Sequence, residues 1–398
     1  MSSGPYDMFD YLVWRGDLTF AQDGLNDVDN LVFASLAYLP FDDIFQQEDG
    51  LSEIMLAEVS RDYHEVTDKI AEIDYNPFFR RLPTLFHQAA ATSRFADVCI
   101  SNYVNIIDET HTKQLAAVVF SMNPQQHYVA FRGTDDTITG WKEDFRMSFM
   151  DEVPAQKQAV GYLTNVSTKL PGQLYLGGHS KGGNLAAYCA AHIGNHLLKR
   201  VERVYNNDGP GFQPLIANSE GCQSMLSKLQ TFIPKSSVIG ILLEHPGGYE
   251  IVKSSEISIL QHNPLTWEIN GDSFVKEEEL ARASVALSNT VTSWLDLLSK
   301  DERAEFVEIM FSALEATGAR TLQELTHEKL ALSVNVIKAY KDMDKPTRTL
   351  LKRIIKLFFR QGSKSIADII RTDINALFAR RTKDKVSFEE PLPILLKG

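Results

Sequence analysis

The sequence predicts an α/β protein in which a mostly parallel central sheet is flanked by helices and followed by a helical C-terminal extension. Between residues 98 and 234, apolar runs typical of strands alternate with helix-like segments. This order places helices on both faces of a parallel sheet. Polar and glycine-rich turns follow several of these strands, as expected where chemistry gathers at the carboxyl ends of parallel strands. Beyond about residue 275 the strand signals vanish and helix starts replace them.

The first two parts of the chain are a helical segment and the α/β core. Residues 1–95 are predicted to be mainly helical and to pack on the core, and Asn26, Asp27 and Asp29 are candidates for an N-cap before an apolar cluster. Residues 96–275 are predicted to form the core. Its strands are expected at 98–107, 114–120, 127–131, 201–207 and 231–234, with a further strand starting at residue 173 and helices at 140–150, at 155–169 and after residue 180.

The third part, residues 276–398, is predicted to be a helical C-terminal region. Ser299 and Thr321 each open a capping box, and Pro346 starts a third helix. In that helix, apolar residues at helical spacing alternate with Arg348, Lys352, Arg353, Lys356 and Arg360. Such a helix either packs its apolar face on the core or lies on an anionic membrane. Core packing is favoured, and peripheral membrane contact is retained as the other expectation.

Composition excludes several classes of protein. The net charge of −12 argues against general nucleic-acid binding, although residues 345–398 alone carry +8. No run approaches the 18 apolar residues of a membrane span, and the N-terminus lacks the basic start and apolar core of a signal peptide. Three cysteines and the lack of metal-ligand spacing predict a reduced, cytoplasmic setting without a metal.

The central motif is Gly178-His179-Ser180-Lys181-Gly182, a G-x-S-x-G sequence between an apolar strand and a helix of small residues. The pattern is typical of a nucleophile elbow, a strained strand-to-helix turn that exposes a serine hydroxyl above the sheet. The following helix directs its N-terminal N–H groups to the same place, where they stabilise negative charge. Ser180 is therefore predicted to be a catalytic nucleophile.

A serine nucleophile also needs hydrogen-bond donors for the oxyanion. The elbow itself fixes the backbone N–H of Lys181 as one donor. The second is expected from the strand-end loop Arg132-Gly133-Thr134, where glycine permits a close approach. Thr134 offers both its N–H and its hydroxyl there. Lys181 and Thr134 are therefore predicted to form the oxyanion hole.

Two sequence blocks resemble class 3 lipases. Val129–Thr134 followed by Gly140–Asp144 is similar to the AFRGT…W..D block of that family, which pairs it with a G-H-S-x-G-G elbow like residues 178–183. The whole chain also resembles a lipase-like bacterial family of unassigned function with a G-H-S-K-G-G elbow. The resemblance implies an α/β-hydrolase fold, the elbow serine as nucleophile, Thr134 in the oxyanion hole, and ester or acyl-lipid substrates.

The general base is expected to be a histidine. It should lie after Ser180, because the chain order in this fold is serine, acid, histidine. His262 lies between a strand-like run and a proline, a location that suits a catalytic base. His245 is the second candidate. His192 and His196 are expected on the surface of the helix after the elbow, and His327 in the C-terminal helices.

The acid is open between two carboxylates. Class 3 lipases place it after the second strand that follows the elbow, where this chain has serines near residues 234–238. Asp208 ends the first strand after the elbow, and the Gly-Pro-Gly sequence behind it fixes a turn that can hold it. Asp208 is predicted in preference to Glu244, which follows an apolar run next to His245. An Asx-turn is the other role for Asp208.

The side chain of Lys181 has no assigned role, although lipases usually carry an apolar residue at this position. Its ammonium group is expected to pair with Asp208 or Glu244, to bind an anionic group of the substrate, or to stay solvated at the surface.

These features predict a serine hydrolase that cleaves a carboxylic ester through Ser180, His262 and Asp208 and a covalent acyl-enzyme, without a cofactor. The alternative is a catalytically inactive hydrolase-fold protein that binds an acyl ligand or a protein partner. The substrate is not fixed by the fold, and the oligomeric state stays open.

Overall fold

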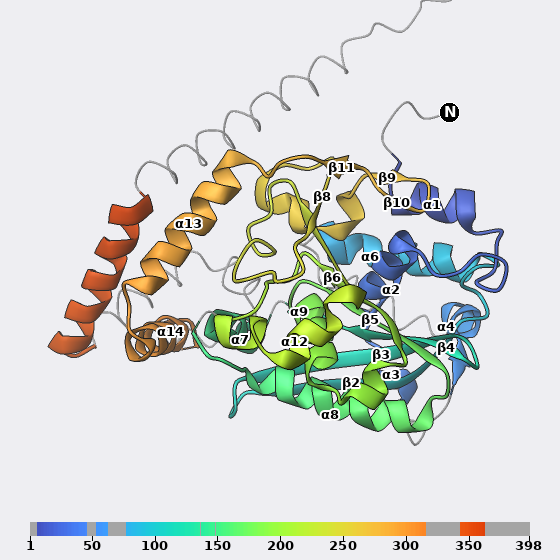
Figure 1. Cartoon of the computed structure of the whole chain (residues 1–398), viewed down its shortest axis with the longest axis horizontal. Helices are drawn as coiled ribbons and strands as arrows, with labels where there is room; N and C mark the ends of the chain where they lie inside the picture. The colour runs from blue at the N-terminus through green and yellow to red at the C-terminus, as the bar shows by residue number, and fades with distance from the viewer. Residues whose placement is uncertain are drawn as a thin grey trace, which may run out of the picture.

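A computed structural model of the chain describes residues 6–45, 53–62, 77–135, 137–147, 149–315 and 343–362. Within these ranges nine strands form one sheet in the order β1-β2-β3-β4-β5-β6-β7-β8-β11 (Figure 1). The strands are β1 (Ile54–Met55), β2 (Cys99–Asp108), β3 (Lys113–Asn123), β4 (Gln126–Phe131), β5 (Gln173–His179), β6 (Val201–Asn207), β7 (Leu229–Pro234), β8 (Glu250–Val252) and β11 (Lys276–Glu277).

The centre of the sheet is parallel and its edges are antiparallel. Strands β4 to β8 pair in parallel, whereas β1 to β4 form an antiparallel meander and β11 pairs antiparallel with β8. This topology with helices on both faces is an α/β-hydrolase fold, as predicted. The strand signals end slightly later than expected, at β11, and a small hairpin of β9 (Ile269–Asn270) and β10 (Ser273–Phe274) precedes it.

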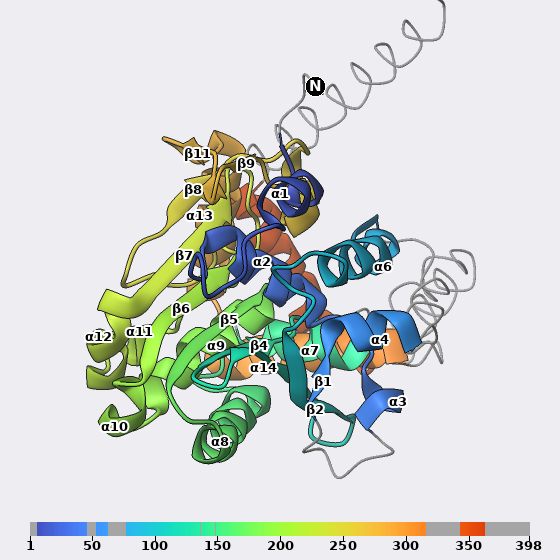
Figure 2. The ribbon, with the colours of Figure 1, turned by 90° about the vertical axis from the view of Figure 1, so that its right-hand side faces the viewer.

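Helices cover both faces of the sheet (Figure 2). Side chains alternate along β3, so that Val118 and Phe120 join the core beneath the N-terminal helices while Ala117 and Val119 join the core on the other face. The N-terminal face carries α1 (Met8–Arg15), α2 (Asp27–Leu36) and α6 (Pro77–Ala90), and the other face carries α8 (Pro154–Lys169), α9 (Lys181–His192) and α12 (Glu220–Met225). The other helices before residue 275 are α3 (Asp42–Phe45), α4 (Leu56–Asp62), α7 (Ile138–Met147), α10 (Asn195–Leu198), α11 (Pro214–Ala217), η1 (Leu226–Lys228), η2 (Ser258–His262) and η3 (Pro264–Thr266).

A buried ion pair holds the N-terminal helices together. Asn26 is the one of the three candidates that caps α2, since its side chain accepts hydrogen bonds from the backbone of Val28 and Asp29. The Asp29 carboxylate is fully buried and accepts two hydrogen bonds from the Arg94 guanidinium, at 2.8 and 2.5 Å. The same guanidinium donates to three backbone carbonyls between residues 18 and 24. Arg94 therefore ties the loop before α2 to the segment that leads into the sheet.

The C-terminal region packs against the side of the core through its helices. Helix α14 (Lys300–Glu315) begins at the predicted Ser299 capping box, and its Val307 and Phe311 pack on Ile138 and Phe149 around α7. Residues 345–362 form the third predicted helix, which packs on α13 (Arg282–Asp296) through a hydrogen bond from the Trp294 indole to the Ile354 carbonyl.

Two expectations for the C-terminal region remain without a structural test. The Thr321 capping box lies outside the described residues. The division of the chain at residues 95 and 275 stays a prediction. Among the described residues, none of the helices combines the length and the apolar character needed to cross a membrane.

Replacing Arg94 by methionine should destabilise the fold by about 3–5 kcal/mol, because it leaves a buried carboxylate without its counterion. Urea unfolding of Arg94→Met measures the loss. The matched control is Arg61→Met, which removes an exposed ion pair with Asp62 and should cost less than about 1 kcal/mol. Equal losses in the two variants would contradict the anchoring role of Arg94.

Candidate active site

The turn between β5 and α9 has the geometry of a nucleophile elbow. Ser180 has φ +57° and ψ −133°, a conformation that is costly for a residue with a side chain. Its N–H donates to the Asn207 carbonyl at 2.9 Å. Gly182 permits the turn, because a Cβ there would lie 2.0 Å from the Phe131 carbonyl oxygen. The turn is therefore pressed against the end of β4, and Ser180 is held at the carboxyl edge of the sheet.

Asp208 and His262 are brought together beside this turn. Asp208 directly follows β6, is fully buried, and has φ +53°. The Nδ1 of His262 lies 2.6 Å from Asp208 Oδ2, and the histidine side chain is 28% exposed. An Nδ1–H that donates to the carboxylate leaves Nε2 as the acceptor nitrogen of a neutral imidazole. This is the tautomer that a general base needs.

The other oxygen of Asp208 is also held. The Ser237 hydroxyl donates to Asp208 Oδ1 at 2.5 Å and accepts the N–H of Gly240 at 2.9 Å. Ser237 belongs to the serines that stand where class 3 lipases place their acid. No local pattern indicated a role for Ser237, yet it fixes the orientation of Asp208.

His179, the residue before Ser180, anchors the backbone of His262. Its Nε2 lies 2.7 Å from the His262 carbonyl oxygen and its Nδ1 lies 3.1 Å from the Tyr38 hydroxyl. The two histidine rings are 4.5 Å apart. Burial holds the pKa of His179 well below its usual value, and the charge of a protonated His262 lowers that pKa further. His179 is therefore a neutral ring that donates to His262 and accepts from Tyr38.

The loop 132–134 lies against the elbow, as predicted. A Cβ on Gly133 would lie 2.5 Å from the His179 carbonyl oxygen and 3.1 Å from Ser180 Cβ. The Thr134 hydroxyl donates to Asp144 Oδ2. Because that proton is engaged, the backbone N–H of Thr134 is the donor that this loop can offer to an oxyanion.

Every expectation for the Lys181 side chain is wrong. The side chain is buried, and its ammonium group lies 3.1 Å from Glu143 Oε2 and 3.6 Å from Asp144 Oδ1. It therefore neither pairs with Asp208 or Glu244 nor reaches solvent or a substrate anion. Burial lowers the pKa of Lys181, but the neighbouring carboxylates outweigh this effect and raise it. The sequence around Lys181 did not indicate this environment, because its partners lie on α7, 37 or more residues away in the chain.

The remaining candidates form no hydrogen bond or ion pair with Asp208 or His262 within the described residues, although the Asp208 charge acts on His245. Glu244 is exposed, and its backbone forms a bridge with Phe212. The His245 ring packs edge-on against Tyr249, and burial lowers its pKa. Among the described residues, no hydrogen bond or ion pair joins the Glu244 side chain to a histidine. His192 is exposed, as expected, and stacks on Tyr188, whereas His327 lies outside the described residues.

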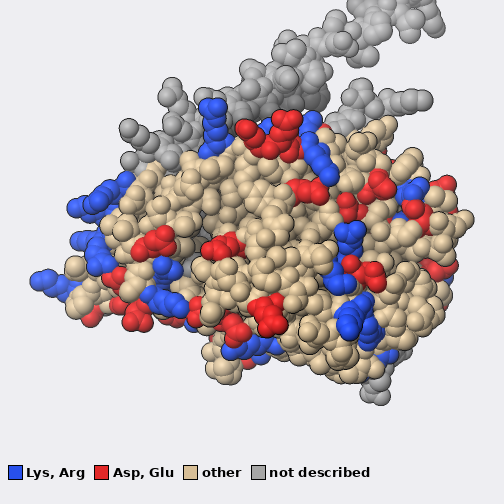
Figure 3. Space-filling model, in the orientation of Figure 1, with Lys and Arg blue, Asp and Glu red and all other residues tan. Residues whose placement is uncertain are grey.

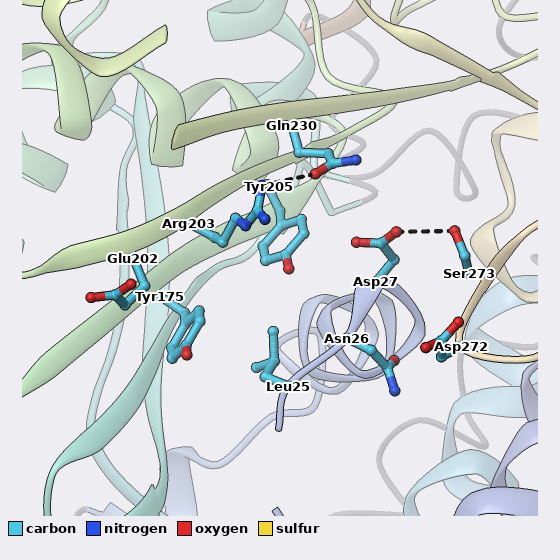
Figure 4. A pocket seen from close by; sticks show the side chains of 10 residues that line it. All are labelled: Leu25, Asn26, Asp27, Tyr175, Glu202, Arg203, Tyr205, Gln230, Asp272 and Ser273. Atoms are coloured by element: carbon cyan, nitrogen blue, oxygen red, sulfur yellow. Dashed lines mark hydrogen bonds between the residues drawn. The ribbon is translucent and has the colours of Figure 1, made fainter. Parts of the chain in front are cut away.

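A separate hollow of about 450 Å³ lies near the amino ends of β5, β6 and β7 (Figure 4). It is lined by polar side chains, including Asp27, which accepts a hydrogen bond from Ser273 at 3.0 Å. Ser180 and Asp208 follow the carboxyl ends of β5 and β6, so this hollow belongs to the opposite edge of the sheet. In the described residues, no group of three or more histidine, cysteine or acidic side chains is arranged to hold a metal ion.

Comparison with known proteins gives one family match. The sequence model of the Mbeg1-like family matches residues 89–312. No curated protein matches the chain significantly. Similar solved structures include M37 lipase, with 13% identity over 55% of this chain and 70% of that chain and a TM-score of 0.33. They also include a native Rhizomucor miehei lipase propeptide complex, with 17% identity over 57% and 76% and a TM-score of 0.31. At these scores the solved structures carry no argument about chemistry.

The buried neutral state of His179 should make the fold sensitive to acid. As pH falls below the usual histidine pKa, the unfolded chain takes up a proton at this residue that the folded chain refuses, so stability is lost. His179→Gln removes this proton uptake. We expect urea midpoints between pH 7.5 and 5.5 to fall less for this variant than for the wild type. Replacing the exposed His111 by glutamine should leave the wild-type slope, and an equal slope in His179→Gln would refute the assignment.

Proposed function

The chain belongs to the Mbeg1-like family and has a lipase-like α/β-hydrolase fold, and from this we propose that it is a serine hydrolase acting on a carboxylic ester. The observation that carries the proposal is the 2.6 Å contact between Asp208 and His262 Nδ1, made at the edge where the strained Ser180 turn lies. A buried carboxylate that orients an imidazole beside a nucleophile elbow is the arrangement that activates a serine hydroxyl.

In the proposed mechanism, the Ser180 oxygen attacks the ester carbonyl and its proton passes to His262 Nε2. Asp208 stabilises the imidazolium that forms. The carbonyl oxygen becomes an oxyanion, which accepts hydrogen bonds from the backbone N–H groups of Lys181 and Thr134. When the carbonyl re-forms, the alcohol leaves with the proton from His262 and the acyl group stays on Ser180. A water molecule then attacks this acyl-enzyme ester and passes a proton to His262. When the carbonyl re-forms, the Ser180 oxygen leaves with that proton and the carboxylic acid is released.

The alternative is an inactive protein that keeps the scaffold to bind an acyl ligand or a partner. This alternative drew its support from the lack of an acid near residues 234–238. Asp208 offers His262 a carboxylate from a different strand, and Ser237 from that same region holds it in place. The hydrogen bond from Ser237 to the second oxygen of Asp208 fixes this carboxylate toward His262, as an active triad requires. We therefore favour the hydrolase over the inactive protein.

We further propose an acyl-lipid substrate presented at an anionic membrane. The helix 345–362 has no acidic residue, and its exposed face carries Ile355, Phe359, Lys352, Lys356 and Arg360. Basic side chains gather along the left edge of the molecule in Figure 3, where Figure 1 places this helix. Such a face combines apolar insertion with attraction to anionic lipid. The three free cysteines agree with a reducing, cytoplasmic location.

Substitutions in the proposed triad should abolish activity without unfolding the protein. Ser180→Ala should lose both fluorophosphonate labelling and hydrolysis of p-nitrophenyl esters, while His262→Ala and Asp208→Asn should lower kcat about 10³–10⁴-fold or more. His245→Ala and Glu244→Gln are the matched controls and should stay near wild type. A folded wild-type protein that the probe does not label would refute the enzyme, and loss of activity in His245→Ala alone would reassign the base.

Charge reversal on the exposed helix face should weaken membrane binding. The triple variant Lys352→Glu, Lys356→Glu, Arg360→Glu should bind phosphatidylserine-containing vesicles at least about 100-fold more weakly, because loss of each basic residue alone costs about 1 kcal/mol and the new carboxylates add repulsion. Sedimentation with vesicles measures this. Hydrolysis of a soluble ester is the control and should not change. Equal binding of both proteins to anionic vesicles would contradict the membrane contact.

A further inference from the structure

A buried ion cluster beside the oxyanion loop has no part in the chemistry proposed above. It consists of Lys181 at the start of α9 and of Glu143 and Asp144 on α7. Lys181 is 2% exposed and Glu143 is fully buried, whereas the Asp144 side chain is 24% exposed and only its Oδ1 is shielded from solvent. Two carboxylates thus face one ammonium group. That ammonium group belongs to Lys181, whose backbone N–H is proposed to bind the oxyanion. Buried charges of this kind are costly unless each is compensated.

Glu143 is compensated by several partners. Its Oε2 accepts the backbone N–H of Gln114 at 3.1 Å, and its Oε1 accepts the backbone N–H of Ala155 at 2.9 Å. The Lys181 ammonium is a third partner, at 3.1 Å. Glu143 would therefore keep two strong donors if the lysine charge were lost.

Asp144 depends on Lys181 much more. Its Oδ2 accepts the Thr134 hydroxyl. Its Oδ1 is buried and has no hydrogen-bond partner within the described part of the chain, so the Lys181 charge 3.6 Å away is what compensates it. The pKa of Asp144 is raised to about 6. Burial is the main cause and Glu143 adds to the rise, whereas the Lys181 charge and the Thr134 hydrogen bond oppose it.

The other groups around Asp144 do not replace that compensation. Arg132 is the other cation of the loop, and it is paired with Asp135 at 3.3 Å. The Tyr38 phenol is neutral, because burial raises its pKa well above the usual value. Lys181 is thus the cation that faces Asp144 directly.

We propose that the Lys181 side chain is a positioning residue for the oxyanion loop. Its ammonium group holds the Asp144 carboxylate, and the hydrogen bond from Thr134 to that carboxylate holds residues 132–134 beside Ser180. One residue then serves the oxyanion twice, through its own N–H and by fixing the loop that carries the second N–H. The catalytic part of this inference rests on the proposed hydrolase function, whereas the positioning part does not.

Four proteins test the proposal: the wild type, Lys181→Met, Asp144→Asn and the double variant. Hydrogen–deuterium exchange in peptides spanning residues 131–135 reports loop order without any reaction. The kcat and KM for p-nitrophenyl esters report its effect on chemistry. Lys181→Met should speed loop exchange at least about tenfold and lower kcat about 10–100-fold, with KM within about twofold, because a misplaced donor acts on the transition state.

The decisive result is a reversal of sign. In the wild-type background Asp144→Asn should speed loop exchange and lower kcat, since it removes the group that the lysine holds. In the Lys181→Met background the same change should slow exchange and raise kcat, since it removes a carboxylate whose buried Oδ1 has lost its compensating cation. A lysine that only fills space predicts that Asp144→Asn acts in the same direction in both backgrounds, and that result would overturn the proposal.

Two controls keep the test decisive. Lys157→Met removes an exposed lysine paired with Glu152 and should match the wild type in both measurements. If Lys181→Met does not fold, Asp144→Asn alone decides, and wild-type loop exchange in that variant refutes the proposal. If the wild type neither labels nor hydrolyses esters, the hydrolase function fails, and the exchange pattern still confirms or refutes the positioning role.

Discussion

The site depends on how closely the turn between β5 and α9 packs against the end of β4. Gly182 leaves no room for a side chain between that turn and the Phe131 carbonyl. This contact holds Ser180 in its strained conformation and brings the loop 132–134 to the same place. Because β4, β5 and β6 are parallel neighbours, the residues that follow each of them emerge at one edge. Strand pairing thus assembles groups that are far apart in sequence, from 28 residues for Ser180 and Asp208 to 76 residues for Arg132 and Asp208.

The candidate base is fixed at two points of different kinds. Asp208 holds the ring of His262, and His179 holds its backbone carbonyl. The second contact requires that His179 stay neutral, because a cation there would repel the imidazolium that forms when His262 accepts a proton. Burial supplies that neutrality. The residue between strand and nucleophile is therefore part of the support of the base, which its place within the G-x-S-x-G motif did not indicate.

Local patterns predicted much of the fold and of the site. Alternating apolar runs identified the strands of the core, and the turn at Ser180 was recognisable because its glycines and its strand–turn–helix setting are contiguous in sequence. Asp208 was found for the same reason, since its turn follows a strand directly. His262 followed from chain order and a loop setting. The structure brings the last two residues together, while their catalytic roles stay a prediction.

What the sequence did not predict depends on contacts across elements. The burial of Lys181 depends on the direction of the first turn of α9 and on the two carboxylates of α7. The residues next to Lys181 in the chain predict neither of them. Ser237 was noted only as a departure from a family pattern, because its partner Asp208 lies on another strand. Tyr38 lies in the turn that follows α2, and no local pattern specifies where that turn meets the sheet.

The contacts of Tyr38 and Asn30 show that the site includes residues outside the segment that the family model matches. The Mbeg1-like match begins at residue 89. Asn30 nevertheless exchanges two amide hydrogen bonds with Asn207, the residue before Asp208, and Tyr38 contacts His179 beside Ser180. Homologous segments cut at the family boundary would expose these partners to water. The segment around Asn30 and Tyr38 thus supports the site, although it lies before the residues that the family model matches.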